Sequence, residues 1–402
     1  MPKIVSITLA TGVLHLDLIP GRIPLHRLLG FAARISSKRK FLFVSKILGK
    51  HYPVSPLVMR WSYRALARMV LKNLSQQGSL WVGMAETATG LGYGVFEAAC
   101  REGLDKGLFM QTTRYHLDDI EKLGFEEAHS HATDFFLYYP ERESYRKRFL
   151  TAETLVLIDD EISTGKTFLR LIKTYQAVNP HLQKVYIVSL VNFAHLHDRK
   201  VLETEAGVAI EWIAFRSGQI QFDDNQNAEL ANIVVNVSSN DACKKALLAW
   251  PGRLGMSAPI NLGEDTVPNV IQLFKEKLDS RPLLVLGTGE CNALGFMLGR
   301  ALERAGYKVK VQSTTRSPIQ SGNDITSVCQ FTDNYQDNIP NFIYNLNPAD
   351  YREIIVCHET PLCPALIERL DAWQAISAQL QVVGRLSDES SEPYAKLHFF
   401  RP

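Results

Sequence analysis

The stretch that decides the fold is residues 154–172, TLVLIDDEISTGKTFLRLI. It opens with an apolar run, residues 155–158, that leads directly into Asp159 and Asp160. A short continuous apolar run is typical of a strand that is buried on both faces of a parallel sheet. Ligands of open α/β sheets bind outside the carboxyl ends of such strands. The pattern therefore predicts a strand that delivers two carboxylates to a ligand-binding edge.

The turn after this strand, residues 161–167, has the equipment of a phosphate site. It offers successive backbone N–H groups, hydroxyls and the N-terminus of the predicted helix. Gly165-Lys166-Thr167 also resembles the end of a Walker A loop, but that loop requires a glycine where this chain has Asp160. The chain has no other Gly-Lys-Ser/Thr, so we exclude a P-loop. An acidic turn that merely caps a helix is the alternative.

An approximate internal repeat indicates that the chain is duplicated. Residues 80–103 and 283–306 each combine an apolar run, a Gly-rich turn with a glutamate, and a helical pattern. Each copy then reaches a Thr-Thr-Arg sequence, which ends at Arg114 in the first half and at Arg316 in the second. At 402 residues the chain is also long enough for two domains of about 200 residues. We place their boundary between residues 240 and 265, where periodicity breaks.

The fold class predicted from these patterns is α/β. We expect a parallel sheet flanked by helices, followed by a second, related α/β domain. The expected strands of the first half are 41–45, 80–84, 108–113, 153–158, 184–191 and 209–214, and its helices are 56–75, 91–102 and 166–178. The expected strands of the second half are 282–286, 307–312 and 353–357, and its helices are 268–278, 294–305 and 364–379.

Charge and composition narrow the class of protein. The formal net charge is +2, from 44 basic and 42 acidic residues spread along the chain, so we expect no nucleic-acid partner. No stretch approaches the roughly 20 apolar residues of a membrane span, so we expect no membrane partner. The six cysteines form no C-x-x-C pair, which favours a reducing cytoplasm over a disulfide framework or a zinc site.

The segment VLIDDEISTGKT, residues 156–167, resembles the signature that binds 5-phosphoribosyl 1-pyrophosphate (PRPP) in type I phosphoribosyltransferases. The resemblance implies that Asp159 and Asp160 meet the ribose 2′- and 3′-hydroxyls and act as the catalytic pair. It implies that the loop around the 5-phosphate consists of Glu161, Ser163, Thr164, Gly165, Lys166 and Thr167. Some purine-specific members carry a third acid where this chain has Ser163, so the acceptor base stays open.

The same resemblance assigns the Gly-rich turn at residues 83–90 to pyrophosphate. Ala85, Glu86 and Thr87 match the family's pyrophosphate loop, and Arg114 stands where members often place a basic residue. A purely structural turn and a solvated arginine are the alternatives. The family also implies Mg²⁺, which we expect to be held mainly by PRPP and water near the two aspartates, without a direct protein ligand.

A closer resemblance covers nearly the whole chain. Residues 30–54 and the Thr-Arg-Ser-Pro at 315–318 resemble bacterial phosphoribosyltransferases of tellurite-resistance and stress gene clusters, which carry a C-terminal TRSP domain. It implies a phosphoribosyltransferase domain at residues 1–245 and a TRSP-like domain at 255–402. The expected reaction transfers phosphoribose from PRPP to a small heterocyclic base and releases pyrophosphate. A PRPP-sensing regulator without turnover and a module that pairs with another protein are the alternatives, and a homodimer is left open.

The second half departs from the PRPP signature. Its matching strand ends in Cys357-His358-Glu359, and no Thr-Gly-Lys-Thr follows. We therefore expect no PRPP site there. Because the Gly-rich turn at 287–291 and Arg316 keep the repeat pattern, we expect them to form a separate ligand or partner surface with Arg316 exposed. A tight structural turn is the alternative.

Overall fold

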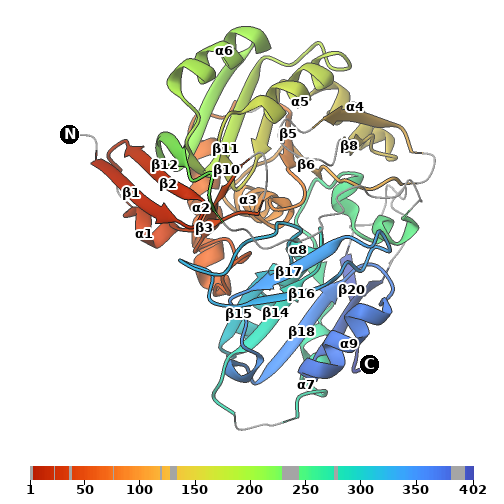
Figure 1. Cartoon of the computed structure of the whole chain (residues 1–402). Coiled ribbons are helices and arrows are strands. Elements are labelled where there is room, and N and C mark those ends of the chain that lie inside the picture. The colour runs from red at the N-terminus through yellow and green to blue at the C-terminus, as the bar shows by residue number, and fades with distance from the viewer. Residues whose placement is uncertain are drawn as a thin grey trace.

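The computed structural model has two main β-sheets with packed helices, one in each half of the chain (Figure 1). The predicted fold class is confirmed. The structure describes residues 3–21, 23–35, 39–75, 77–117, 120–126, 134–228, 244–275, 279–381 and 394–402.

The first sheet has a parallel centre and an antiparallel margin. Strands β6, β5, β9, β11 and the first part of β12 run parallel, and β2 and β1 continue the sheet in antiparallel fashion along the second part of β12. The order across the sheet is β1 (Lys3–Leu9), β2 (Gly12–Leu18), β12 (Ala209–Asp224), β11 (Lys184–Asn192), β9 (Thr154–Ile158), β5 (Ser79–Gly83) and β6 (Gly107–Gln111), with β10 (Glu161–Ile162) beside β11.

The second sheet repeats the parallel centre of the first. Strands β19, β18, β14 and β15 run parallel, and β20 joins β19 antiparallel. The order is β13 (Asn261–Leu262), β20 (Tyr394–Phe400), β19 (Ile376–Gln381), β18 (Glu353–His358), β14 (Leu283–Gly287) and β15 (Val309–Ser313). Three two-stranded hairpins complete the described strands: β3 (Leu29–Ala33) with β4 (Phe41–Ser45), β7 (Lys122–Glu126) with β8 (Asp134–Tyr138), and β16 (Val328–Thr332) with β17 (Pro340–Tyr344).

Most of the predicted helices form close to their expected bounds. The described α-helices are α1 (Leu25–Leu28), α2 (Pro56–Leu71), α3 (Thr89–Arg101), α4 (Glu143–Thr151), α5 (Lys166–Gln176), α6 (Leu196–Ala206), α7 (Thr266–Ile271), α8 (Asn292–Arg304) and α9 (Pro364–Trp373). Helices α2, α3 and α4 pack against strands of the first sheet.

Two helix predictions were wrong in length. The helix expected at 364–379 ends at Trp373, because Gln374 adopts a left-handed conformation with a φ of 51° and the chain continues as β19. The helix expected at 268–278 spans only Thr266–Ile271.

Helices α3 and α8 join the two halves. Ser55 caps α2 by accepting a hydrogen bond from the Val58 N–H, and Pro56 occupies the first helical turn. Helix α2 packs against both α3 and α8, and these two helices also contact each other. Helix α3 is buried on all sides along residues 89–99, as expected of a helix enclosed between a sheet and other helices. One hydrophobic core therefore runs through both halves.

Matching hydrogen bonds confirm the duplication. The Thr112 N–H donates to the Gly83 carbonyl at 3.0 Å, and the Thr314 N–H donates to the Gly287 carbonyl at 3.0 Å. Both threonine hydroxyls also accept a turn N–H, from Ala85 at 2.8 Å and from the equivalent Gly289 at 2.9 Å.

The correspondence extends beyond the repeated segment. The Tyr138 hydroxyl in β8 donates to the Tyr115 carbonyl at 3.1 Å, and the Tyr344 hydroxyl in β17 donates to the Ser317 carbonyl at 2.6 Å. Each half thus places a hairpin tyrosine on the segment that follows Thr-Thr-Arg. Between Thr113 and β9, the described residues form β7, β8 and α4.

Candidate active site

The parallel pairing of β5 with β9 brings two turns to one edge of the first sheet. Gly83 pairs with Ile158, and the Met84 N–H donates to the Ile158 carbonyl at 3.0 Å. The chain after β5 therefore enters the turn at 83–90 beside the residues that follow β9. On the other side, the Asp159 N–H donates to the Val188 carbonyl of β11 at 3.0 Å. The sheet itself thus fixes Asp159 between two neighbouring strands.

The carboxyl groups of Asp159 and Asp160 repel each other when both are ionised. Asp159 Oδ1 accepts the Asp160 N–H at 2.9 Å, and both side chains are half-buried. Burial, and secondly the charge of Asp160, raises the pKa of Asp159 well above its usual value. Burial also raises the pKa of Glu161, although Arg39 forms an ion pair with it. A cationic or hydroxyl-bearing ligand at this edge would relieve the repulsion.

Gly165 shapes the turn between β10 and α5. Its φ is 79°, in the left-handed region that favours glycine, and it is the N-cap of α5. Gly165 itself has no side chain to cap the helix, and the Lys166 N–H donates to the Thr164 hydroxyl at 3.5 Å. A helix N-terminus of this kind favours an oxyanion through its N–H groups and its dipole. Ser163, Thr164 and Thr167 are half-buried around this helix start, and Lys166 is exposed. Glu161, the remaining residue of the expected loop, belongs to β10 and precedes this helix start.

The β3–β4 hairpin and the segment after it add two cations that the sequence analysis did not single out. Arg39 pairs with Glu161, and its guanidinium lies 4.6 Å from the Phe41 ring centroid. Its Nε and Nη2 atoms are buried without a hydrogen-bond partner among the described residues. Lys50 donates from Nζ to the hydroxyl of Thr87 in the second turn. The edge thus carries positive charge on both of its turns.

The turn at 83–90 is held from several sides. The Thr89 hydroxyl donates to the Glu86 carbonyl at 3.1 Å, and the Ala85–Glu86 peptide bond is cis. Glu86 is buried, and its Oε2 lies 3.3 Å from Nε of Arg316 in the second half. Its Oε1 has no hydrogen-bond partner among the described residues. The arginine beside this turn is therefore Arg316.

Arg114 contacts different residues from Arg316, its counterpart in the repeat. Its backbone N–H donates to Glu290 Oε1 at 3.0 Å, and its guanidinium lies 4.2 Å from the Phe135 ring centroid. The sequence pattern placed Arg114 at the end of the strand, and the structure places it three residues beyond β6, against the β7–β8 hairpin.

Arg316 is not exposed, contrary to our expectation. Its side chain is 13% exposed, because the segment of the second half that carries it packs against the first half. Its guanidinium donates to the Tyr115 hydroxyl and lies 5.2 Å from the centroid of that ring. A separate surface in the second half built on Arg316 is thereby excluded.

The corresponding edge of the second half is filled by side chains. Arg253, which is fully buried, donates from Nη2 to Glu290 Oε2 and to Glu359 Oε1, each at 2.8 Å. The Tyr335 hydroxyl donates to Glu359 at 3.0 Å. His358, which replaces Asp159, is buried, with Nε2 2.7 Å from the Ser377 hydroxyl. These buried side chains therefore have hydrogen-bond partners within the protein.

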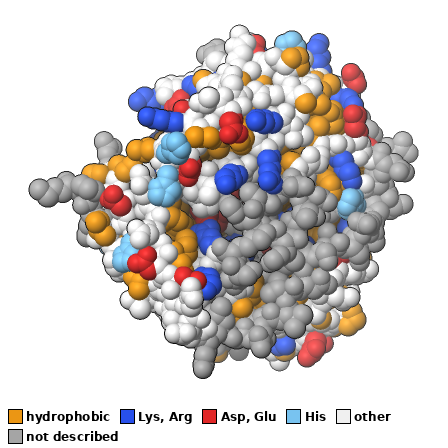
Figure 2. Space-filling view, turned by 45° about the horizontal axis from the view of Figure 1, so that its top comes forward, with side chains coloured by type: hydrophobic (Ala, Val, Ile, Leu, Met, Phe, Trp, Pro, Cys, Tyr) orange, Lys and Arg blue, Asp and Glu red, His pale blue; other side chains and the backbone are white. Residues whose placement is uncertain are grey.

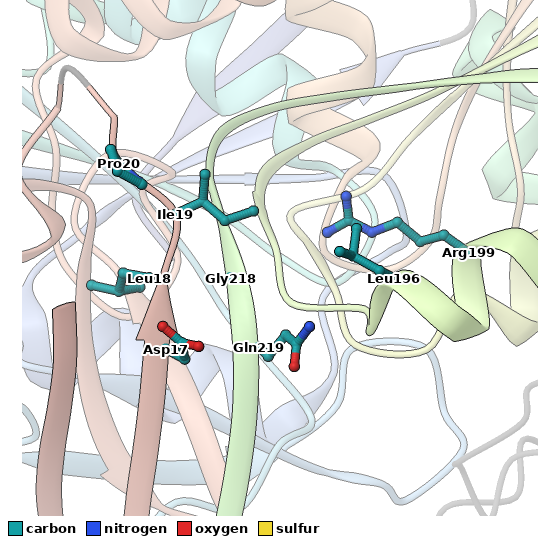
Figure 3. Close-up of a pocket in the computed structure, with 8 residues that line it drawn as sticks. All are labelled: Asp17, Leu18, Ile19, Pro20, Leu196, Arg199, Gly218 and Gln219. Carbon is teal, nitrogen blue, oxygen red and sulfur yellow. The ribbon is translucent and has the colours of Figure 1, made fainter. Parts of the chain in front are cut away.

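A separate pocket of about 270 Å³ lies beside the first sheet, between β2, β12 and α6 (Figure 3). Its lining is mostly apolar, with Arg199 and Asp17 facing it. None of the site residues expected from the sequence belongs to its lining, which consists of Asp17, Leu18, Ile19, Pro20, Leu196, Arg199, Gly218 and Gln219.

The described residues contain no group of three or more His, Cys, Asp or Glu side chains able to hold a metal ion. Basic and acidic side chains are interspersed on the face shown in Figure 2, without an extended area of one sign among its coloured atoms. Within the described ranges, no helix is both long and apolar enough to cross a membrane.

Two family models match this chain. Residues 28–219 match a model described as phosphoribosyl transferase, and residues 250–372 match one described as the TRSP domain C-terminal to it. Together the two models span most of both sheets. No curated protein matches the chain.

Solved structures similar to the first half are also phosphoribosyltransferases. The adenine enzyme of Giardia lamblia, complexed with 9-deazaadenine, is 20% identical, with 47% of this chain and 94% of that chain covered at a TM-score of 0.33. The adenine enzyme of Trypanosoma brucei, in complex with AMP, pyrophosphate and ribose-5-phosphate, is 17% identical, with 47% and 76% covered at a TM-score of 0.34. The orotate enzyme of Mycobacterium tuberculosis is 13% identical, with 47% and 91% covered at a TM-score of 0.29.

Proposed function

Because this chain belongs to the phosphoribosyl transferases that carry a C-terminal TRSP domain, we propose that it transfers phosphoribose from PRPP to a small heterocyclic base. The reaction releases pyrophosphate. The observation that carries the proposal is the meeting of two turns at one sheet edge, where the acidic pair Asp159 and Asp160 stands beside a helix N-terminus and two cations.

The first turn suits a ribose 5-phosphate. Asp159 and Asp160 bind the ribose 2′- and 3′-hydroxyls, which donate to carboxylate oxygens. The 5-phosphate lies at the N-terminus of α5, where the N–H groups of the first turn and the helix dipole favour an anion. Its loop consists of Glu161, Ser163, Thr164, Gly165, Lys166 and Thr167.

The second turn suits pyrophosphate. Ala85, Glu86 and Thr87 form this loop, and Lys50 at the Thr87 hydroxyl supplies positive charge for the leaving group. As the bond to pyrophosphate breaks, positive charge develops on the ribose and is stabilised by the nearby carboxylates. We propose Arg114, which follows β6 and lies 4.2 Å from the Phe135 ring centroid, as a further basic residue for pyrophosphate.

Mg²⁺ fits this edge through the acidic pair. Burial, and secondly the charge of Asp160, raises the pKa of Asp159, and two neighbouring carboxylates are suitable oxygen ligands for a divalent cation. When bound, the ion neutralises the charge of the departing pyrophosphate. We propose that PRPP oxygens and water supply most of its ligands, near Asp159 and Asp160.

We assign residues 1–245 to the phosphoribosyltransferase domain and residues 255–402 to the TRSP-like domain. Met256, just beyond this boundary, exchanges two backbone hydrogen bonds with Phe109 of β6, at 2.8 and 3.0 Å, so the start of the second domain pairs with the first sheet. The connecting segment thus covers the edge of the first sheet before the second sheet begins.

A panel of heterocyclic bases tests the function. The full chain is incubated with PRPP, Mg²⁺ and each base in turn, and pyrophosphate release and nucleotide formation are measured. Release that depends on one base, with the matching nucleotide formed in equal amount, supports the proposal. Binding of PRPP without release for any base would identify a PRPP-sensing protein instead, and no binding at all would contradict both functions.

A further inference from the structure

An arginine of the second half forms part of the candidate pyrophosphate turn in the first half. Arg316 Nε lies 3.3 Å from Glu86 Oε2, although the two residues belong to different copies of the repeat. Arg316 Nη2 also donates a hydrogen bond to the Tyr115 hydroxyl. The Arg316 side chain is 13% exposed, so it is mostly but not completely buried.

The backbone around Arg316 is anchored to both halves. Within the second half, the Ile319 N–H donates to the Tyr344 hydroxyl at 2.9 Å. Toward the first half, the Ile35 N–H donates to the Pro318 carbonyl at 3.0 Å, and the Gln320 N–H donates to the Ala33 carbonyl at 3.0 Å. These bonds attach the Arg316 segment to the β3–β4 hairpin, which also carries Arg39. Arg316 is therefore placed before any ligand arrives, which reduces the entropy lost on binding.

The equivalent glutamates of the two turns differ in how completely they are satisfied. Both oxygens of Glu290 accept protein hydrogen bonds, one from the Arg114 N–H at 3.0 Å and one from Arg253 at 2.8 Å. At Glu86, Oε2 faces Arg316, whereas Oε1 is buried without a hydrogen-bond partner among the described residues. The protein thus satisfies both oxygens of Glu290, whereas Glu86 Oε1 is a buried acceptor that a hydrogen-bond donor or a cation bound with the ligand could satisfy.

The charges around the turn at residues 83–90 determine which ligand it can bind. A lone carboxylate at Glu86 would repel pyrophosphate, whereas the cations Arg316 and Lys50 together outweigh it. A planar guanidinium is also well suited to paired phosphate oxygens. We propose that Arg316 binds the pyrophosphate group of PRPP held in the first half, so that the TRSP domain completes the active site. This inference rests on the function proposed above.

The test compares three ligands and two arginines by calorimetry in the presence of Mg²⁺. Arg316→Met removes the proposed contact. Arg300→Met is the matched control, because Arg300 is also a second-half arginine paired with a first-half glutamate, Glu97, but lies between α3 and α8. The ligands are PRPP, inorganic pyrophosphate and ribose 5-phosphate, and thermal unfolding checks that each variant is folded.

Arg316→Met should weaken PRPP and pyrophosphate at least about tenfold, since a charge-assisted contact is lost, and should change ribose 5-phosphate less than about twofold. Arg300→Met should affect the three ligands alike. Equal weakening of ribose 5-phosphate and PRPP by Arg316→Met, or unchanged PRPP affinity, overturns the inference while leaving the proposed function intact. A wild-type chain that binds neither PRPP nor pyrophosphate overturns both.

Two further variants separate a direct contact from an indirect one. If Arg316 only neutralises Glu86, then adding Glu86→Gln to Arg316→Met should restore PRPP affinity. We expect the double variant to bind PRPP at least about tenfold more weakly than Glu86→Gln alone, and restored affinity would contradict a direct contact. Should Arg316→Met fail to fold, Arg316→Lys keeps the charge without the planar fork, and a selective loss for pyrophosphate is again expected.

Discussion

Gly165→Ala tests whether the turn before α5 is the phosphate loop. Gly165 has a φ of 79°, and a Cβ there would lie 2.7 Å from Leu202 Cδ1 and 3.4 Å from the Trp212 ring. The left-handed conformation costs about 1–2 kcal/mol for alanine, and the crowding adds about 1–3 kcal/mol. We therefore expect the free energy of unfolding to fall by about 2–5 kcal/mol unless the turn moves. Either a shifted turn or the new methyl group disturbs the approach of a phosphate to the helix N-terminus.

Gly207→Ala is the matched control for this variant. Gly207 has a φ of 67° at the end of α6, and a Cβ there meets nothing within 4 Å. It should lose only the backbone contribution of about 1–2 kcal/mol and bind PRPP as the wild type does. Urea unfolding gives the stabilities, and calorimetry with PRPP and Mg²⁺ gives the affinities. We expect Gly165→Ala to bind PRPP at least about tenfold more weakly. Equal PRPP affinity in the two variants would refute the phosphate-loop assignment.

Three other predictions concern charged and titrating groups. Asp159→Asn with Asp160→Asn should abolish pyrophosphate release without lowering the thermal midpoint at neutral pH, because the raised pKa of Asp159 means that its ionised form destabilises the fold; residual release, or a lower midpoint, would contradict this. Burial lowers the pKa of His358 to about 4, so the free energy of unfolding should fall by up to about 3 kcal/mol as pH falls from 6.5 toward 4. In urea unfolding, His358→Asn should lose less stability than the wild type across that range. An equal loss in both proteins would contradict the prediction. Arg253→Met should lower the free energy of unfolding by about 3–5 kcal/mol, because it leaves two buried glutamates without their arginine. A decrease below about 1 kcal/mol in the same assay would contradict this prediction.

The sequence predicts the helices and strands whose formation depends on neighbouring residues in the chain. The apolar runs before Asp159 and in β14 are buried strands as expected, because only the interior of a covered parallel sheet accommodates such runs. The end of α9 was mispredicted, since the left-handed residue there is Gln374 rather than a glycine or asparagine. The helical pattern also continues into the residues that form β19, so periodicity alone could not locate the boundary.

The site was predictable only in part for a similar reason. Asp159, Asp160 and the loop up to Thr167 are contiguous in sequence, so one pattern indicates them all. Arg39 reaches Glu161 across 122 residues, and no local pattern encodes that contact. The repeated Thr-Thr-Arg was a signal for Arg316, but it could not reveal that the two copies exchange partners when the halves pack together.

The stoichiometry of PRPP binding tests the central claim most directly. Calorimetry on the full chain with PRPP and Mg²⁺ should give one site per chain. The first-half edge has polar atoms without a partner among the described residues, whereas Arg253, Glu290 and Glu359 pair with one another in the second half. The same titration on the variant Asp159→Asn with Asp160→Asn should show binding weakened at least about tenfold. Two sites per chain, no binding by the wild type, or undiminished binding by the double variant would contradict the account.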